Sequence, residues 1–174
     1  MLNSPLINMV PLDSFNYNNE FKDLCEYVYK VTHLSSFNKK GCAYYKKGIA
    51  EVLRCFGFKF KPTRISEEAY KSIENKEDLI KNVTYKNWYN NRTNIFIFFE
   101  HIIPLGSLID RCQKCSSENK VVEFLAELEF TIILKTENEI LKKNGYEKKG
   151  RESIENALLA YENCGIQLRK IYYK

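Results

Sequence analysis

The hydrophobic periodicity of this chain changes near residue 92, and the change decides which fold class it can adopt. Before that point, apolar residues recur with helical spacing. The stretch AYYKKGIAEVLRCFG predicts one helix that places Ile49, Val52, Leu53 and Phe56 together and ends at Gly57. The face of an earlier helix is predicted by Leu24, Tyr27, Val28 and Val31. After that point, NRTNIFIFFEHIIP alternates in steps of two and ends at a proline, which is typical of a β-strand. The sequence therefore predicts an α+β fold.

Further elements follow from helix start and stop residues. Ser66 precedes acidic residues and is expected to cap a third helix. TENEILKKNG predicts a helix with Thr136 as its N-cap, Glu139 three residues later and Gly145 after its end. FTIILK and IQLRKIYY are typical of strands, and SLIDRC, KVVEFLAELE and RESIENALLAYENCG of helices.

The length of 174 residues allows one domain with a substantial core, but not two large independent domains. We therefore expect one compact unit with two parts. Residues 1–92 form a mainly helical part that could contact DNA, and residues 93–174 hold the strands ending in the polar motifs discussed below.

The charge balance suits an anionic partner. The chain has 27 Lys and Arg against 22 Asp and Glu, a net charge of +5. This weakly favours a nucleic acid over a membrane. The longest apolar run, Ile95 to Phe99, is far shorter than the roughly 20 residues that span a bilayer. The N-terminal stretch lacks the basic region of a signal peptide, so we expect a cytoplasmic protein with no membrane partner.

The six cysteines are interpreted as reduced and mostly buried, because most lie in helix-like segments rather than in a loop-rich scaffold. Cys112 and Cys115 form one CxxC motif. A closed tetrahedral zinc site needs a second pair of ligands at comparable spacing, and none is evident in the sequence. We therefore do not predict a structural zinc.

The motif FFEHIIP places Glu100 and His101 side by side at the end of an apolar strand. An imidazole is a suitable base for water at neutral pH, and a carboxylate is a suitable ligand for a hard divalent cation. The alternative is a polar pair that only stabilises the strand end, and spacing alone favours that interpretation. Ideal alternation sends the two side chains to opposite faces, so joint use requires a bulge or twist there.

FFEHIIP, followed by the strand-to-helix step TIILKTENE, resembles the ββα-metal (His-Me finger, HNH-like) nucleases of the restriction-endonuclease type. The resemblance covers Ile95 to Gly145. It implies that His101 is the general base and Glu100 a catalytic metal ligand. It also implies that Glu139 or Asn138 is a second metal ligand, and that the cofactor is Mg²⁺ or another divalent ion.

On this resemblance, residues 93–174 are predicted to be a ββα-metal nuclease part with additional helices. The predicted function is a metal-dependent endonuclease that hydrolyses double-stranded DNA, of the type II restriction kind. A homodimer is expected, because cutting both strands of a symmetric site needs two active sites. Two alternatives stay open. One is a non-catalytic DNA-binding or protein-interaction module, and the other is a toxin nuclease acting on RNA or on DNA without sequence preference.

Basic residues near aromatic ones are the candidates for contacts with the DNA backbone, because cations meet phosphates while rings stack or pack. In FKFKPTR the alternation is also explained if Phe58 and Phe60 face the core and the lysines face water. The predicted DNA-binding residues are Lys59, Lys61, Arg64, Arg92 and Lys135.

Overall fold

The computed structural model describes residues 10–11, 17–34, 37, 42–57, 60–73, 96–147 and 149–172. Its helices are α1 (Tyr17–Thr32), α2 (Cys42–Gly57), α3 (Glu67–Lys71), α6 (Leu105–Lys114), α7 (Glu118–Leu125), α8 (Lys135–Lys143) and α9 (Ile154–Asn163). Its strands are β1 (Val10–Pro11), β2 (Phe60–Lys61), β3 (Arg64–Ser66), β4 (Ile97–His101), β5 (Phe130–Leu134) and β6 (Leu168–Lys170). The predicted α+β class is confirmed.

A four-stranded mixed sheet with the order β4-β5-β3-β6 organises the fold. Strand β5 pairs antiparallel with β4 and parallel with β3, and β3 pairs antiparallel with β6. Strands β1 and β2 form a separate antiparallel ladder. Because β3 lies between two strands from the C-terminal half, the sheet draws on both sides of the boundary expected at residue 92.

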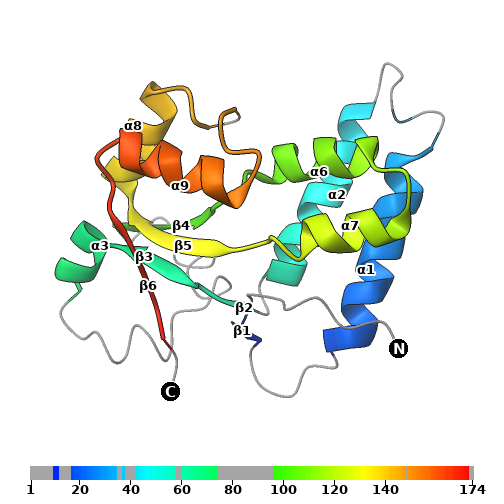
Figure 1. Ribbon diagram of the computed structural model, residues 1–174, viewed down its shortest axis with the longest axis horizontal. Coiled ribbons are helices and arrows are strands. Elements are labelled where there is room, and N and C mark those ends of the chain that lie inside the picture. Colours follow the sequence, from blue (N-terminus) through cyan, green and yellow to red (C-terminus); the bar gives the residue numbers. More distant parts are fainter. Residues whose placement is uncertain are drawn as a thin grey trace.

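Two hydrophobic clusters cover the two faces of this sheet. The larger joins α1, α2, α6 and α7 to the sheet through buried residues such as Val28, Leu53 and Phe99. The smaller lies between the sheet and α8 and α9, and includes Ile133 and Tyr161. In Figure 1, α8 and α9 lie over the sheet, while α1, α2, α6 and α7 gather at one end of it. None of the described helices is long and apolar enough to cross a membrane.

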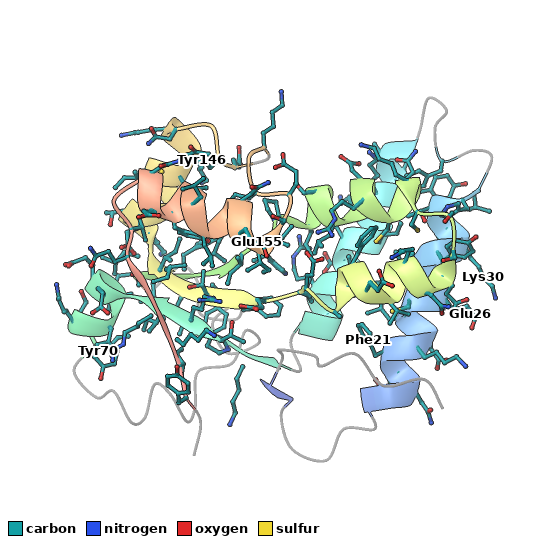
Figure 2. The ribbon with its side chains drawn as sticks, viewed as in Figure 1. Phe21, Glu26, Lys30, Tyr70, Tyr146 and Glu155 are labelled. Atoms are coloured by element: carbon teal, nitrogen blue, oxygen red, sulfur yellow. The ribbon has the colours of Figure 1, made fainter. Side chains whose placement is uncertain are left out.

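The buried stripes of α1 and α2 are narrower than their periodicity suggests. Val28 and Leu53 are fully buried, but Tyr27 is 42% exposed and Val52 is 38% exposed. Each exposed residue lies one position before a buried one, which turns it about 100° away from the contact line. Figure 2 shows Phe21 among the helices, whereas Glu26 and Lys30 lie on the outer side of α1.

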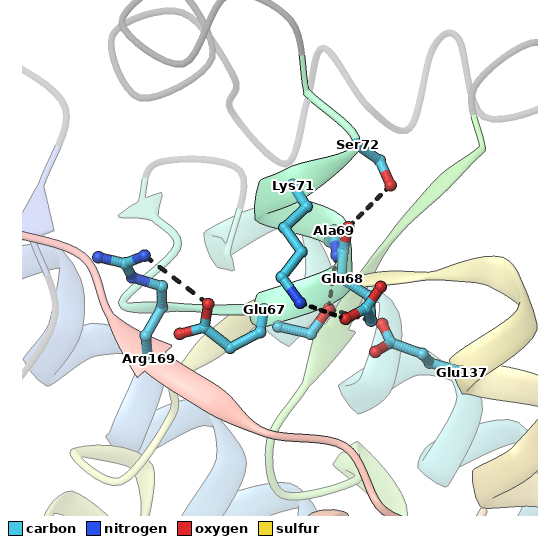
Figure 3. Close-up of polar contacts among 8 residues, drawn as sticks. Glu67, Glu68, Ala69, Lys71, Ser72, Glu137 and Arg169 are labelled. Carbon is cyan, nitrogen blue, oxygen red and sulfur yellow. Dashed lines mark hydrogen bonds and ion pairs between the residues drawn. The ribbon is translucent and has the colours of Figure 1, made fainter.

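Ser66 caps α3, as predicted, and also connects α3 to α8. Its hydroxyl oxygen accepts a hydrogen bond from Ala69 N at 3.1 Å, and its hydroxyl donates one to Glu137 Oε2 at 2.6 Å. Figure 3 shows Glu137 beside the first turn of α3. The same carboxylate accepts from Leu134 N at 2.7 Å. The N-cap of α8 is therefore Leu134, two residues before the expected position, and the prediction of Thr136 as its N-cap is wrong.

We predict that Ser66→Ala lowers the free energy of unfolding by about 2 kcal/mol, because it removes an N-cap and a buried hydrogen bond to a carboxylate. Urea denaturation measures this loss. Ser72→Ala is the matched control, since Ser72 donates a comparable bond to Glu68 O from an exposed position at the other end of α3. Equal losses for the two variants would contradict the connecting role of Ser66.

Candidate functional site

Strand β4 pairs with β5 residue by residue up to its last position. Phe99 pairs with Ile132, Glu100 with Thr131 and His101 with Phe130. This register has no bulge, so side chains alternate between the two faces as in any regular strand. Glu100 and His101 therefore point to opposite faces of the sheet, and the bend that joint use of the two requires is not present at this strand end.

Glu100 points toward α8 and α9, where it forms a buried ion pair with Arg151. Arg151 Nη2 donates to Glu100 Oε1 at 2.7 Å, and the two side chains are 2% and 14% exposed. Arg151 also donates to the Tyr161 hydroxyl at 3.2 Å and to Tyr146 O at 2.7 Å. Burial raises the pKa of Glu100, while the charge and hydrogen bond of Arg151 oppose that rise. The carboxylate is thus occupied by a guanidinium.

His101 lies on the other face, against Phe130, with the ring centroids 4.6 Å apart. Burial, together with the positive charges of Arg54 and Arg151, lowers the pKa of His101 to about 3. The ring is neutral at physiological pH. A base of that strength is poorly matched to the activation of water near pH 7.

The two candidate metal ligands on α8 differ in exposure. Glu139 is exposed and receives a hydrogen bond from Lys142 Nζ at 2.9 Å, while Asn138 is buried. Among the residues with described positions, no three His, Cys, Asp or Glu side chains form a group that could hold a metal ion. Because Glu100 faces a guanidinium and Glu139 an ammonium group, the described side chains do not fit a magnesium site.

The predicted DNA-binding residues occupy different surroundings. Arg64 Nε lies 3.2 Å from Glu129 Oε2, and both side chains are largely buried. Lys61 in β2 and Lys135 at the start of α8 are partly exposed. Lys59 and Arg92 lie outside the described residues. Arg64 is therefore an internal ion-pair partner, and it stabilises the junction of β3 with the segment before β5.

A row of polar residues crosses the sheet on the side that Glu100 occupies. The strand registers align Glu100 with Thr131, Thr131 with Arg64, and Arg64 with Lys170. Sequence reasoning missed the groups that complete this row, Arg151, Tyr161 and Glu129. Alternation along each strand could have predicted which of its residues lie on the same face of the sheet. No local signal pairs Glu100 with Arg151, because 51 positions separate them.

The cysteines of the CxxC motif lie at the end of α6 in the larger hydrophobic cluster. Cys112 is fully buried and Cys115 is 8% exposed. Burial raises the pKa of Cys112 to about 12, so the thiol stays protonated at neutral pH. His33 Nε2 lies 2.9 Å from Cys115 O and so contacts the backbone of the motif. Cys55 is exposed, unlike most of the cysteines described.

Comparison with known proteins finds no matching family model, curated protein or solved structure. The resemblance of FFEHIIP to the His-Me finger nucleases therefore stays a prediction. The chemistry of this region has to be argued from its own contacts.

We predict that Arg151→Met lowers the free energy of unfolding by about 3 to 5 kcal/mol, because it leaves the Glu100 carboxylate buried without its counter-charge. The double variant Glu100→Leu with Arg151→Met should be more stable than Arg151→Met alone. Urea denaturation measures both. Lys120→Met, which breaks the exposed pair with Glu123, is the control and should cost less than about 1 kcal/mol. A similar cost for Arg151→Met and Lys120→Met would refute the buried pair.

A second prediction concerns pH. The pKa of His101 is about 3 in the folded protein against 6.5 normally, so below pH 6.5 only the unfolded chain binds this proton. Stability is therefore lost as the pH falls, by about 2 kcal/mol for this group between pH 7 and pH 5. Urea denaturation of the wild type and of His101→Gln at both pH values isolates the effect. An equal pH dependence of the two proteins would show that His101 titrates normally.

Proposed function

We propose that this chain is a non-catalytic module that binds another protein. The observation that carries the proposal is the placement of Glu100 and His101 on opposite faces of β4. Hydrolysis needs an acid or base and a ligand that converge on one reacting group. Here the carboxylate contacts Arg151 and the imidazole contacts Phe130, so each side chain stabilises one face of the sheet.

The pairing of surface charges supports a protein partner over DNA. Eight ion pairs among the described residues have exposed or partly exposed side chains, and each matches a Lys or Arg with a carboxylate. One of them, Arg169 with Glu67 at 3.8 Å, is visible in Figure 3. Cations matched in this way release few counterions from a phosphate backbone, which weakens non-specific binding to DNA. Tyrosines are enriched in protein interfaces, and Tyr44 and Tyr172 are 83% and 82% exposed.

The test is incubation of the protein with plasmid DNA, with and without magnesium. We predict that the wild type and His101→Ala leave the plasmid equally intact, and that binding to duplex DNA is no tighter than non-specific. Gel electrophoresis measures cleavage of the plasmid, and fluorescence anisotropy measures binding to duplex DNA. The result that overturns the proposal is magnesium-dependent cleavage that His101→Ala abolishes while its circular dichroism spectrum stays that of the wild type.

One observation favours the endonuclease as a second candidate. Strands β4 and β5 are antiparallel, and α8 follows β5 directly and packs against both strands. This is the ββα order that the resemblance implies. Under this candidate the chain hydrolyses DNA as a restriction-type enzyme that depends on a divalent metal ion. Mapping the ends of any cleaved plasmid separates that enzyme from a nuclease without sequence preference, and an RNA substrate separates it from an RNA-cleaving toxin.

A further inference from the structure

Helix α2 carries a stripe of apolar and small residues that the rest of the described protein leaves exposed or, at Gly48, partly exposed. Tyr44 is 83% exposed, Val52 is 38% exposed, and Cys55 is exposed. Gly48 lies between them, and a Cβ atom built on it meets nothing within 4 Å. The spacing of these four residues places them along one line of a helix. We call this line the α2 stripe.

Another side of α2 packs against the rest of the protein. Ile49 and Leu53 are fully buried, and α2 contacts α1 and α6. None of the four residues of the α2 stripe is among the buried core residues of the described protein. Resting on the proposed function, we propose that the α2 stripe binds the same stripe of a second copy of this chain, with the two helices antiparallel around a two-fold axis.

The shape of the stripe suits a second copy. A two-fold axis placed between Gly48 and Val52 sets Gly48 of each copy opposite Val52 of the other. The branched side chain of Val52 then packs over Gly48, which has no side chain. This contact occurs twice across the axis, so the two helices approach closely. This reciprocity is what an isologous interface requires, because each copy offers both the hollow and the side chain that fills it.

The charges beside the stripe select the antiparallel orientation. Lys47 and Glu51 are both exposed and flank the stripe on one side, four positions apart. When two identical helices pair antiparallel, this flank meets itself in reverse order, so Lys47 of each copy lies near Glu51 of the other. A parallel pair would place this flank of the two copies on opposite sides of the interface, so Lys47 of one copy would not meet Glu51 of the other. Glu51 also pairs with Arg54 of its own helix through Oε2.

The size of the contact sets the expected affinity. One helix from each copy buries less than the roughly 1,600 Å² of a standard interface. We therefore expect a weak dimer with a dissociation constant of about a micromolar or above, which forms as the concentration rises.

Sedimentation velocity of the full chain over a range of concentrations tests this dimer. Gly48→Leu fills the hollow and should weaken association about tenfold to a hundredfold, because an overfilled contact cannot close. The same change meets open space within one copy and improves helix propensity, so the melting temperature should stay the same or rise. Loss of association is thereby distinguished from loss of folding.

Gly106→Leu is the matched control. Gly106 is also a helical glycine whose Cβ would meet nothing within 4 Å, but it lies on α6. This variant should associate like the wild type. Lys47→Glu should weaken association severalfold by placing like charges together, and adding Glu51→Lys should restore it.

A wild type that stays monomeric at about 1 mM, or a Gly48→Leu variant that associates as well as Gly106→Leu, overturns the α2 interface. Neither result bears on plasmid cleavage, which is the measurement that decides the proposed function. Cleavage by a dimeric wild type would overturn the non-catalytic function and leave the interface standing.

Discussion

The one-to-one pairing of β4 with β5 is the constraint on which the arrangement of polar groups depends. With no bulge, the two-residue period continues to the last residue of β4 and sends Glu100 and His101 to opposite faces. Each face has its own hydrophobic cluster, so a polar group delivered to either one must be paired or neutral. Glu100 is paired with Arg151, and His101 is held neutral by burial.

The Glu100 and Arg151 pair connects the sheet to the C-terminal segment that covers it. Removing both charges from water costs several kcal/mol, and their attraction offsets that cost only with well-placed hydrogen bonds. Arg151 has such bonds to Tyr161 in α9 and to the backbone of Tyr146 after α8. A sheet residue is thereby connected to both covering helices. If α9 docked in another register, it would leave a charge buried and unpaired, so the pair discriminates against alternative packings.

Local features of the fold could be predicted from the sequence, because their causes lie within a few residues. The strand at residues 97–101, the Ser66 cap and the glycine after α8 depend on alternation, a short side chain and a positive φ of 82°. The prediction failed where a distant group intervened. Helix α8 begins before Thr136 because Glu137 reaches back to Leu134 N and across to Ser66, which lies 71 positions away. Local sequence patterns could not predict the pairing of Glu100 with Arg151 either.

The exposure of Val52 is another feature that local sequence patterns did not predict. Helical periodicity identifies it as apolar and groups it with Ile49 and Leu53, yet only those two are buried by this chain. Periodicity detects that a helix has apolar sides, but it does not reveal what covers each of them. In α2 the apolar surface extends beyond the contact with α1 and α6, and Gly48 interrupts it at the point where a neighbouring backbone could approach. An apolar residue exposed beside a helical glycine is unfavourable in water, and contact with a second copy would remove that cost.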